Sequence, residues 1–399
     1  MPTLLQINIT ANWGSTGKIA EAIGIAAMRR GWDSYIAYGR WCNPSQSHLI
    51  KVGNSIDKYL HYAEQRARDN EGLCSRRATR KLLRQIDEIK PDVVQLHNIH
   101  DHYLNYRLLF EYLNKTDIKV VWTFHDCWAF TGHCFHFVTA DCMKWQTGCF
   151  ECPMKNSFPK TLLDRSKEHY ELKKQLFAGC KNLTIVPVSD WMAGFVSQSF
   201  LKEKRIEVIK NGVDINVFKP SEDKNRDREC YYVLAVSSVW NEDKGLSDIY
   251  KLRSLLSSKY KITIVGLNEK QVKELPEGID GIQRTQNVQA LVELYSGADV
   301  LINPTYADTF PTVNLEALAC GTPVVTYRTG GSPEAIDEKT GLVVEQGDVG
   351  GLASAVEDIC FRDRKQMAKT CRLRAEREFD KDLCFEKYIE LYENLIQRK

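Results

Sequence analysis

Short apolar runs recur along the chain, each ending in polar or glycine residues and followed by a segment of helical character. In the first half the runs are Leu4–Ile9, Tyr35–Tyr38, Val93–Leu96, Val120–Phe124 and Thr184–Val188. In the second half they are Tyr231–Val236, Lys261–Val265, Val300–Ile302, Val324–Tyr327 and Leu342–Val344. This alternation is typical of parallel sheets whose strands are joined by crossover helices. The pattern predicts an α/β protein with two doubly wound domains.

Two further segments depart from this alternation. Residues 219–229, KPSEDKNRDRE, are highly charged, contain a proline and lack apolar periodicity, so we expect a linker there. In residues 380–399, apolar side chains recur at mostly helical spacing, at Leu383, Tyr388, Leu391, Tyr392 and Leu395. This spacing predicts an amphipathic terminal helix. We therefore expect one domain over residues 1–218, a second over residues 230–379, and a final helix.

Length and composition narrow the class of protein. A chain of 399 residues is too long for one ordinary core and agrees with two domains of roughly 150 to 200 residues. Its net charge of +2 gives no overall attraction to nucleic acid or to an anionic membrane, so we expect no nucleic-acid partner. The N-terminus lacks the basic and apolar regions of a signal peptide, and no apolar stretch approaches roughly 18 residues. We expect a cytoplasmic protein without a transmembrane helix.

Residues 303–334 combine features of a site for an anion and a sugar. Asp308 and Glu316 are separated by seven residues, and Phe310, Pro311 and Thr312 lie between them at an expected helix start, where proline fits the first turn. Main-chain N–H groups there, with the positive end of the helix dipole, would hold a phosphate, while the carboxylates accept hydrogen bonds from sugar hydroxyls. The segment predicts a nucleotide-sugar site. The alternative is that Asp308 caps the helix and Glu316 lies on a solvated face.

Polar residues directly follow several expected strands, where ligands of open parallel sheets bind. Residues 12–18, NWGSTGK, form a glycine loop that could bring N–H groups near a diphosphate, although a plain strand-to-helix turn is the alternative. His97 and His125 each follow a strand, and such a histidine is by itself more often a satisfied polar residue than a catalyst. Lys244 follows another strand and suits the phosphate charge that grows as a leaving group departs, unless it is simply solvated.

The run from Asp308 to Glu316 resembles the D/E-x7-E signature of retaining glycosyltransferases of family 4. The similarity continues through the following Ala-Cys-Gly-Thr-Pro, Val-Val and Gly-Gly-Ser-Pro-Glu. It implies the GT-B fold, in which two Rossmann-like domains face a central cleft and the C-terminal helix crosses back to the N-terminal domain. The resemblance also implies that the C-terminal domain binds the donor and the N-terminal domain binds the acceptor.

The resemblance implies roles for individual residues. Glu316 would bind the ribose of the nucleotide, Lys244 the pyrophosphate, and Asp308 the donor sugar, which His125 would also contact near the reacting centre. Asp308 is one methylene shorter than the usual glutamate, and Val239 stands where many relatives have an arginine. The candidate catalytic residues are His125, Asp308 and Lys244. The donor-binding candidates are Gly14, Gly17, Lys244, Asp308, Phe310, Pro311, Thr312 and Glu316, and the acceptor-cleft candidates are Asn12, Trp13 and His97, of which His97 either lines the cleft or supports the loop carrying His125.

The cysteines form a separate candidate site. Thirteen cysteines without an export signal favour thiols or a metal over a disulfide framework. Cys134, Cys142, Cys149 and Cys152 lie in an expected insertion over residues 127–153 and could bind structural zinc, with buried thiols or redox pairing as the alternatives. The runs HDCWAFTGHC and WQTGCFECP resemble a subgroup of glycosyltransferases from bacterial exopolysaccharide and capsule clusters, similar to those for colanic acid.

A basic segment in the first domain raises the question of a membrane partner. Its members are Arg66, Arg68, Arg76, Arg77, Arg80, Lys81 and Arg84. Peripheral members of the family touch anionic lipid in this way to reach lipid-linked acceptors, which here would place the protein at the inner face of the cytoplasmic membrane. A solvated basic helix is the alternative.

The resemblance, over nearly the full chain, implies an activity. It is transfer of a hexosyl group from a nucleotide-diphosphate sugar to a hydroxyl of a glycan, such as a lipid-linked one, with retention of anomeric configuration. No cofactor is expected for catalysis, because the only D-x-D motif, residues 380–382, is better explained by helix capping than by metal binding. Two rival interpretations are a GT-B sugar-nucleotide epimerase, which needs no acceptor, and a catalytically silent subunit of a polysaccharide assembly complex.

Overall fold

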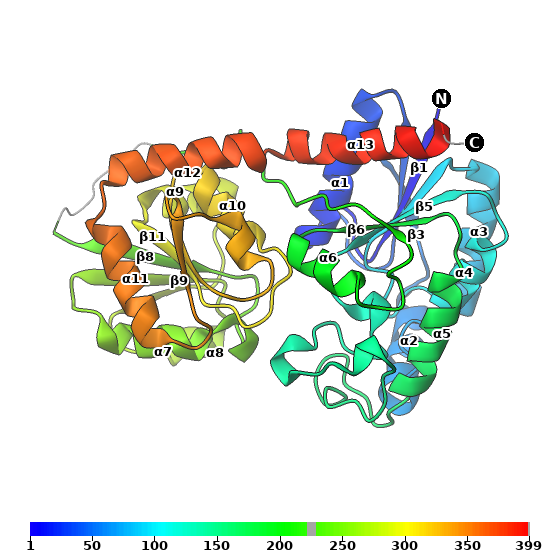
Figure 1. Cartoon of the computed structure of the whole chain (residues 1–399), viewed down its shortest axis with the longest axis horizontal. Helices are drawn as coiled ribbons and strands as arrows, with labels where there is room; N and C mark the ends of the chain where they lie inside the picture. The colour runs from blue at the N-terminus through cyan, green and yellow to red at the C-terminus, as the bar shows by residue number, and fades with distance from the viewer. Residues whose placement is uncertain (222–228, 398–399) are drawn as a thin grey trace. The chain divides into compact units, whose positions relative to one another are not determined.

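The computed structural model describes residues 1–221 and 229–397, and the chain divides into two compact units. Unit 1 comprises Met1–Lys210 and Phe385–Lys399, and unit 2 comprises Asn211–Cys384 (Figure 1). Most of the expected linker, residues 219–229, lies outside the described residues. The expected terminal helix is α13, Lys381–Gln397, whose first residues belong to unit 2 and whose remainder belongs to unit 1.

Unit 1 is built on a seven-stranded parallel sheet in the order β3-β2-β1-β4-β5-β6-β7. The strands are β1 Thr3–Asn8, β2 Asp33–Tyr38, β3 His48–Lys51, β4 Val93–Leu96, β5 Lys119–Phe124, β6 Leu183–Pro187 and β7 Arg205–Ile206. The connecting helices are α1 Gly14–Arg29, α2 Ser55–Arg68, α3 Arg76–Ile89, α4 Tyr106–Leu113, α5 Ser166–Ala178 and α6 Asp190–Val196. Strand order reverses at β1, so ligands are expected at the carboxyl ends of β1 and β4.

Unit 2 repeats the plan with a six-stranded parallel sheet in the order β10-β9-β8-β11-β12-β13. Its strands are β8 Tyr231–Val236, β9 Tyr260–Val265, β10 Ile279–Ile282, β11 Val300–Asn303, β12 Val324–Tyr327 and β13 Gly341–Val344. Its helices are α7 Leu246–Leu255, α8 Glu269–Lys273, α9 Val288–Gly297, α10 Thr312–Ala319, α11 Val349–Phe361 and α12 Arg364–Glu378, with 3-10 turns η4 Glu242–Lys244 and η5 Ser332–Ala335. The predicted pair of doubly wound α/β domains is confirmed.

The terminal helix supplies polar groups to the interior of unit 1. Gln95 in β4 donates a hydrogen bond from Nε2 to Thr123 Oγ1 in β5 at 2.9 Å, and both side chains are buried. Thr123 in turn donates to the hydroxyl of Tyr388 at 3.2 Å, and the Tyr392 hydroxyl donates to Gln95 Oε1. Buried polar groups are costly unless they are hydrogen-bonded, so α13 completes this part of the sheet.

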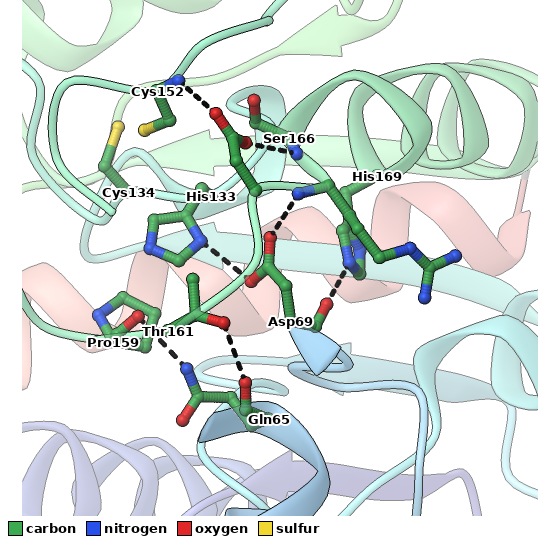
Figure 2. Close-up of polar contacts among 12 residues, drawn as sticks. Gln65, Asp69, His133, Cys134, Cys152, Pro159, Thr161, Ser166 and His169 are labelled. Carbon is green, nitrogen blue, oxygen red and sulfur yellow. Dashed lines mark hydrogen bonds and ion pairs between the residues drawn. The ribbon is translucent and has the colours of Figure 1, made fainter. Parts of the chain in front are cut away.

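A buried carboxylate ties α2 to the segment that follows β5. Asp69 lies just beyond α2, and its Oδ1 is 3.0 Å from Nδ1 of His133, while its Oδ2 accepts the N–H of Arg165 at 2.9 Å. Its carbonyl oxygen accepts a hydrogen bond from His169 of α5, as Figure 2 shows. Burial opposes a charge on His133, but the hydrogen bond and the negative charge of Asp69 outweigh it and raise the pKa of His133. The residues between β5 and α5 form only short 3-10 turns, η1 Trp128–Phe130, η2 Val138–Ala140 and η3 Lys144–Gln146, so contacts of this kind hold them in place.

Candidate functional site

The loop after β1 combines an exposed aromatic pair with a tight approach to the sheet. Trp13 is half exposed and lies 4.7 Å, between ring centroids, from Trp41. The side chain of Asn12, which has a φ of 47°, donates to the carbonyl of Pro44 at 2.7 Å. A Cβ on Gly17 would stand 2.6 Å from Thr10 Oγ1, so glycine is required for α1 to pack this closely. The structure therefore shows a packing role for Gly17.

The first turn of α1 has no side-chain cap, which leaves it suited to bind an anion. Gly14 is its first residue, with a φ of 65°, and Trp13 at the N-cap makes no side-chain hydrogen bond to the helix. N–H groups of a first turn that no side chain caps are ready donors for an anion. Binding of a ligand by Gly14 stays a prediction.

His97 and His125, which directly follow β4 and β5, lie in contact in the structure. Nδ1 of His97 lies 3.1 Å from Nε2 of His125, and the rings stack with centroids 5.4 Å apart. Nε2 of His97 lies 3.1 Å from Oε1 of Gln6 in β1. Burial lowers the pKa of His97 well below its ordinary value and that of His125 to about 4. Both rings are neutral at physiological pH. His97 was expected either to line the cleft or to support the loop that carries His125, and its contact with His125 favours the supporting role.

Beside this pair lies an ion pair that the sequence analysis did not single out. Nε2 of His100 is 2.9 Å from Oδ2 of Asp126, whose Oδ1 accepts the N–H of Trp128 at 2.9 Å. Burial opposes both charges, yet their mutual attraction raises the pKa of His100 and lowers that of Asp126 to about 2. The only signal in the sequence is that both residues adjoin the strand ends carrying His97 and His125.

In unit 2, Lys244 and Asp308 form an ion pair. Nζ of Lys244 lies 2.6 Å from Oδ2 of Asp308 and donates to the carbonyl of Ala307 at 3.3 Å. The next residue, Gly245, has a φ of 72°, and a Cβ there would stand 2.1 Å from the carbonyl oxygen of Pro304. Only glycine allows the lysine turn to pack so closely on the loop after β11. Lys244 and Asp308, two candidate site residues that are far apart in the sequence, therefore lie in contact at the same end of the sheet of unit 2.

The predicted helix start follows this loop. Pro311 is the N-cap of α10, one position before the first helical residue, Thr312, and it makes no side-chain cap. The uncapped first turn is thus a candidate site for the donor phosphates. Phe310 is only 3% exposed, and its ring lies 6.0 Å from that of Phe379. Its side chain belongs to the core, so any contact of Phe310 with a donor would use the main chain.

Glu316 lies further along α10 and is held by a buried tyrosine. The hydroxyl of Tyr295 donates to Oε2 of Glu316 at 2.8 Å, and burial, reinforced by this carboxylate, raises the pKa of Tyr295 well above its ordinary value. On the same helix, Asn314 is fixed by Asn303 of β11 at 2.9 Å and by Ser332 of η5 at 2.9 Å. These buried bonds anchor α10 to the sheet, and no local sequence pattern indicates them.

The four cysteines predicted to bind zinc line one small cavity. Cys134, Cys142, Cys149 and Cys152 surround a space of about 10 Å³. Cys149 accepts the N–H of Gly132 at 3.2 Å, and a hydrogen bond from Cys134 lowers the pKa of Cys152 to about 7. No group of three or more His, Cys, Asp or Glu side chains within residues 1–221 and 229–397 is arranged to hold a metal ion. Zinc binding stays a prediction from the sequence.

Within residues 1–221 and 229–397, no helix is long and apolar enough to cross a membrane.

Comparison with known proteins identifies the family. Residues 19–217 match the model described as Glycosyltransferase Family 4, and residues 230–360 match that described as Glycosyl transferases group 1. The chain is 24% identical over 366 residues to the putative colanic acid biosynthesis glycosyl transferase WcaC of Escherichia coli, with 87% of this chain and 88% of the relative covered. It is 25% identical over 230 residues to an N,N'-diacetylbacillosaminyl-diphospho-undecaprenol alpha-1,3-N-acetylgalactosaminyltransferase of Campylobacter jejuni, covering 53% and 60% of the two chains.

Among solved structures, sucrose-phosphate synthase from Thermosynechococcus elongatus superposes with a TM-score of 0.75 at 16% identity, covering 100% of both chains. At that identity the likeness shows the fold, which is GT-B. The fold, the Asp308 loop with Glu316 on the following helix α10, and the two family models lead to one conclusion: the chain belongs to the family 4, or group 1, glycosyltransferases.

Proposed function

We propose that this glycosyltransferase moves a hexosyl group from a nucleotide-diphosphate sugar to a hydroxyl of a lipid-linked glycan, during assembly of a bacterial surface polysaccharide. The observation that carries the proposal is the Lys244–Asp308 ion pair beside the uncapped start of α10, with Glu316 further along the same helix. The relatives' names support the pathway and the acceptor, since one is assigned to colanic acid and the other to a diphospho-undecaprenol acceptor.

The ion pair suggests how donor binding and chemistry are linked. Diphosphate would replace Asp308 as the partner of Lys244, and the carboxylate would then accept hydrogen bonds from sugar hydroxyls. The bond from the sugar C1 to the phosphate oxygen breaks while the acceptor oxygen bonds C1 on the same face, and the leaving phosphate takes the acceptor proton. Lys244 and the N–H groups of α10 stabilise the charge that develops on the phosphate. The step retains the anomeric configuration and uses no metal.

Titration calorimetry of the full chain with UDP, GDP, ADP and dTDP, in the presence of EDTA, tests donor binding. We expect one nucleotide to bind, and Lys244→Ala to lower kcat by about 100- to 1000-fold. Lys270→Ala is the matched control, because the Lys270 ammonium is exposed and its contact with Glu274, at 3.7 Å, is a weak surface ion pair. Failure of every nucleotide to bind would favour the silent subunit, and an epimerised donor without glycoside would favour the epimerase. NMR of the product reports the anomeric configuration.

We also propose contact with an anionic membrane through unit 1. On α2, Ile56, Tyr59, Leu60 and Tyr62 are between 51% and 76% exposed, and Leu162 is 71% exposed. The two segments are joined, since the carbonyl of Arg66 accepts the N–H of Leu162 at 2.9 Å. Large exposed apolar side chains beside the basic residues of α2 and α3 suit a surface of anionic lipid headgroups.

Vesicle sedimentation tests this surface. We expect the protein to sediment with vesicles containing phosphatidylglycerol more than with phosphatidylcholine alone, and Leu60→Ser to weaken sedimentation. Leu373→Ser, which alters a leucine that is 54% exposed on α12 of unit 2, is the matched control and should sediment like the wild type. Equal sedimentation of the two variants would contradict the assignment.

A further inference from the structure

Two buried side chains, Gln6 and His97, connect the interior of unit 1 to His125. Gln6 in β1 is fully buried, and its Nε2 donates to the carbonyl oxygen of Ala20 in α1 at 2.7 Å. A carbonyl oxygen only accepts, so this contact fixes which end of the Gln6 amide is the NH2 group. The other end, Oε1, is therefore an acceptor facing His97.

The orientation of Gln6 determines where the protons of both histidines are. Nε2 of His97 lies 3.1 Å from Gln6 Oε1 and must carry hydrogen to make that bond. His97 is buried and neutral, so its Nδ1 has a lone pair. Nε2 of His125 lies 3.1 Å from that lone pair and must itself carry hydrogen. The opposite tautomer of His125 would place two lone pairs against each other.

We propose that Gln6 and His97 are positioning residues that hold His125 as its Nε2–H tautomer, so that Nδ1 acts as a hydrogen-bond acceptor toward a substrate hydroxyl. The assignment of a substrate hydroxyl as the partner of Nδ1 rests on the proposed function, whereas the assignment of the tautomer does not. The main chain of His97 is itself held, because its carbonyl oxygen accepts the indole N–H of Trp122 at 2.9 Å. A chain of this kind orients an imidazole as the partner of a catalytic histidine does in other enzymes.

The tautomer limits what His125 can do. A neutral ring with its proton directed to His97 can accept a hydrogen bond from a sugar or acceptor hydroxyl through Nδ1, but it cannot donate one there. It is therefore a recognition group for a hydroxyl and not the acid that protonates the leaving diphosphate. This assignment agrees with a mechanism in which the leaving phosphate receives the acceptor proton.

Long-range 1H–15N correlation spectra of the full chain, labelled with 15N-histidine, test the tautomer directly. His125 is assigned by the signal missing from His125→Gln. We expect the Nε2–H pattern at pH 7 in the wild type. In His97→Leu, which has no acceptor, we expect a mixture of both tautomers, whereas His97→Asn offers Oδ1 near the former Nδ1 position and should restore the single pattern. A wild-type Nδ1–H pattern, an imidazolium, or no change in His97→Leu would overturn the proposal.

Kinetics give the second readout. We expect His97→Leu to lower kcat by about 100-fold, since a misplaced catalytic-site group costs about that much, and His97→Asn to recover most of the loss. His61→Leu is the control for loss of a buried histidine, because the hydrogen bonds of His61 go to Ser75 at 2.8 Å and to the N–H of Gly72 at 3.1 Å, neither of which is a candidate-site residue. It should leave both the His125 pattern and kcat unchanged below its melting temperature. The predicted tautomer without nucleotide-sugar binding would refute the proposed function alone, and turnover with the opposite tautomer would refute this inference alone.

Discussion

Replacing Asp69 with asparagine isolates the contribution of one buried charge. The side chains of Asp69 and His133 are each 1% exposed, and the carboxylate also accepts a main-chain N–H of Arg165. Asparagine has almost the same shape and tolerates the φ of 55° found at this position. The substitution therefore removes the charge and one acceptor without adding backbone strain.

The expected loss is large. Removing one partner of a buried ion pair costs about 3 to 5 kcal/mol, because the other charge is left uncompensated. For a unit of roughly 225 residues, each kcal/mol corresponds to about 2 to 4 °C, so the melting temperature of unit 1 should fall by about 6 to 20 °C. Glu64→Gln on the same helix is the control, since the Glu64 side chain is 41% exposed and its ion pair with Arg68, at 3.6 Å, lies on the surface, so the change should cost less than about 0.5 kcal/mol.

The pH dependence gives a second test, by scanning calorimetry at pH 6 and pH 9. The folded-state pKa of His133 is raised, so the ion pair stabilises the protein fully below the unfolded pKa of about 6.5 and this contribution is lost as the pH rises through the folded pKa. The difference between wild type and Asp69→Asn should therefore be larger at pH 6 than at pH 9. A difference below about 1 kcal/mol, or one equal at both pH values, would refute the interpretation of His133 as a buried cation.

Two further pairs of substitutions test unit 2. Glu316→Gln should weaken nucleotide binding about tenfold, and Tyr295→Phe, which removes the donor to Glu316, should weaken it less; titration calorimetry measures both, and equal affinity in all three proteins would exclude Glu316 from the site. Gly330→Ala should destabilise unit 2 by at least about 1 kcal/mol, because the residue has a φ of 57° and its new Cβ would stand 1.7 Å from the carbonyl oxygen of Asp308. Gly297→Ala, in α9 with no atom within 4 Å, should instead raise the urea midpoint, and a rise for Gly330→Ala would contradict the close approach of Gly330 to the Asp308 loop.

The sequence predicts the central strands well because those strands are buried on both faces and are mostly apolar. Val93–Leu96 and Val324–Tyr327 agree with β4 and β12 at both ends. The strands that the pattern missed, β3, β7 and β10, are short, lie at or near the sheet edges and are at least partly exposed, so they carry no apolar run.

Candidate-site residues divide in the same way. Lys244, Asp308 and Glu316 were identified from local motifs, and the structure places Lys244 and Asp308 in contact. The partners Gln6 and Tyr295 were missed because their contacts are tertiary: Gln6 lies 91 residues from His97 and is embedded in an apolar run. A sequence pattern reports on residues near one another in the chain, whereas the orientation of a catalytic-site side chain depends on whatever the fold places beside it.

The hydroxyls that α13 contributes to unit 1 have a consequence for biosynthesis. Gln95 and Thr123 are translated early, but their partners Tyr392 and Tyr388 follow 297 and 265 residues later. In a nascent chain on the ribosome, β4 and β5 therefore lack the hydrogen bonds that join Gln95 and Thr123 to the final helix. All of unit 2 is translated before that helix is complete. The chain of unit 2 is therefore complete before that of unit 1, which departs from the usual order in which an N-terminal domain is fully translated first.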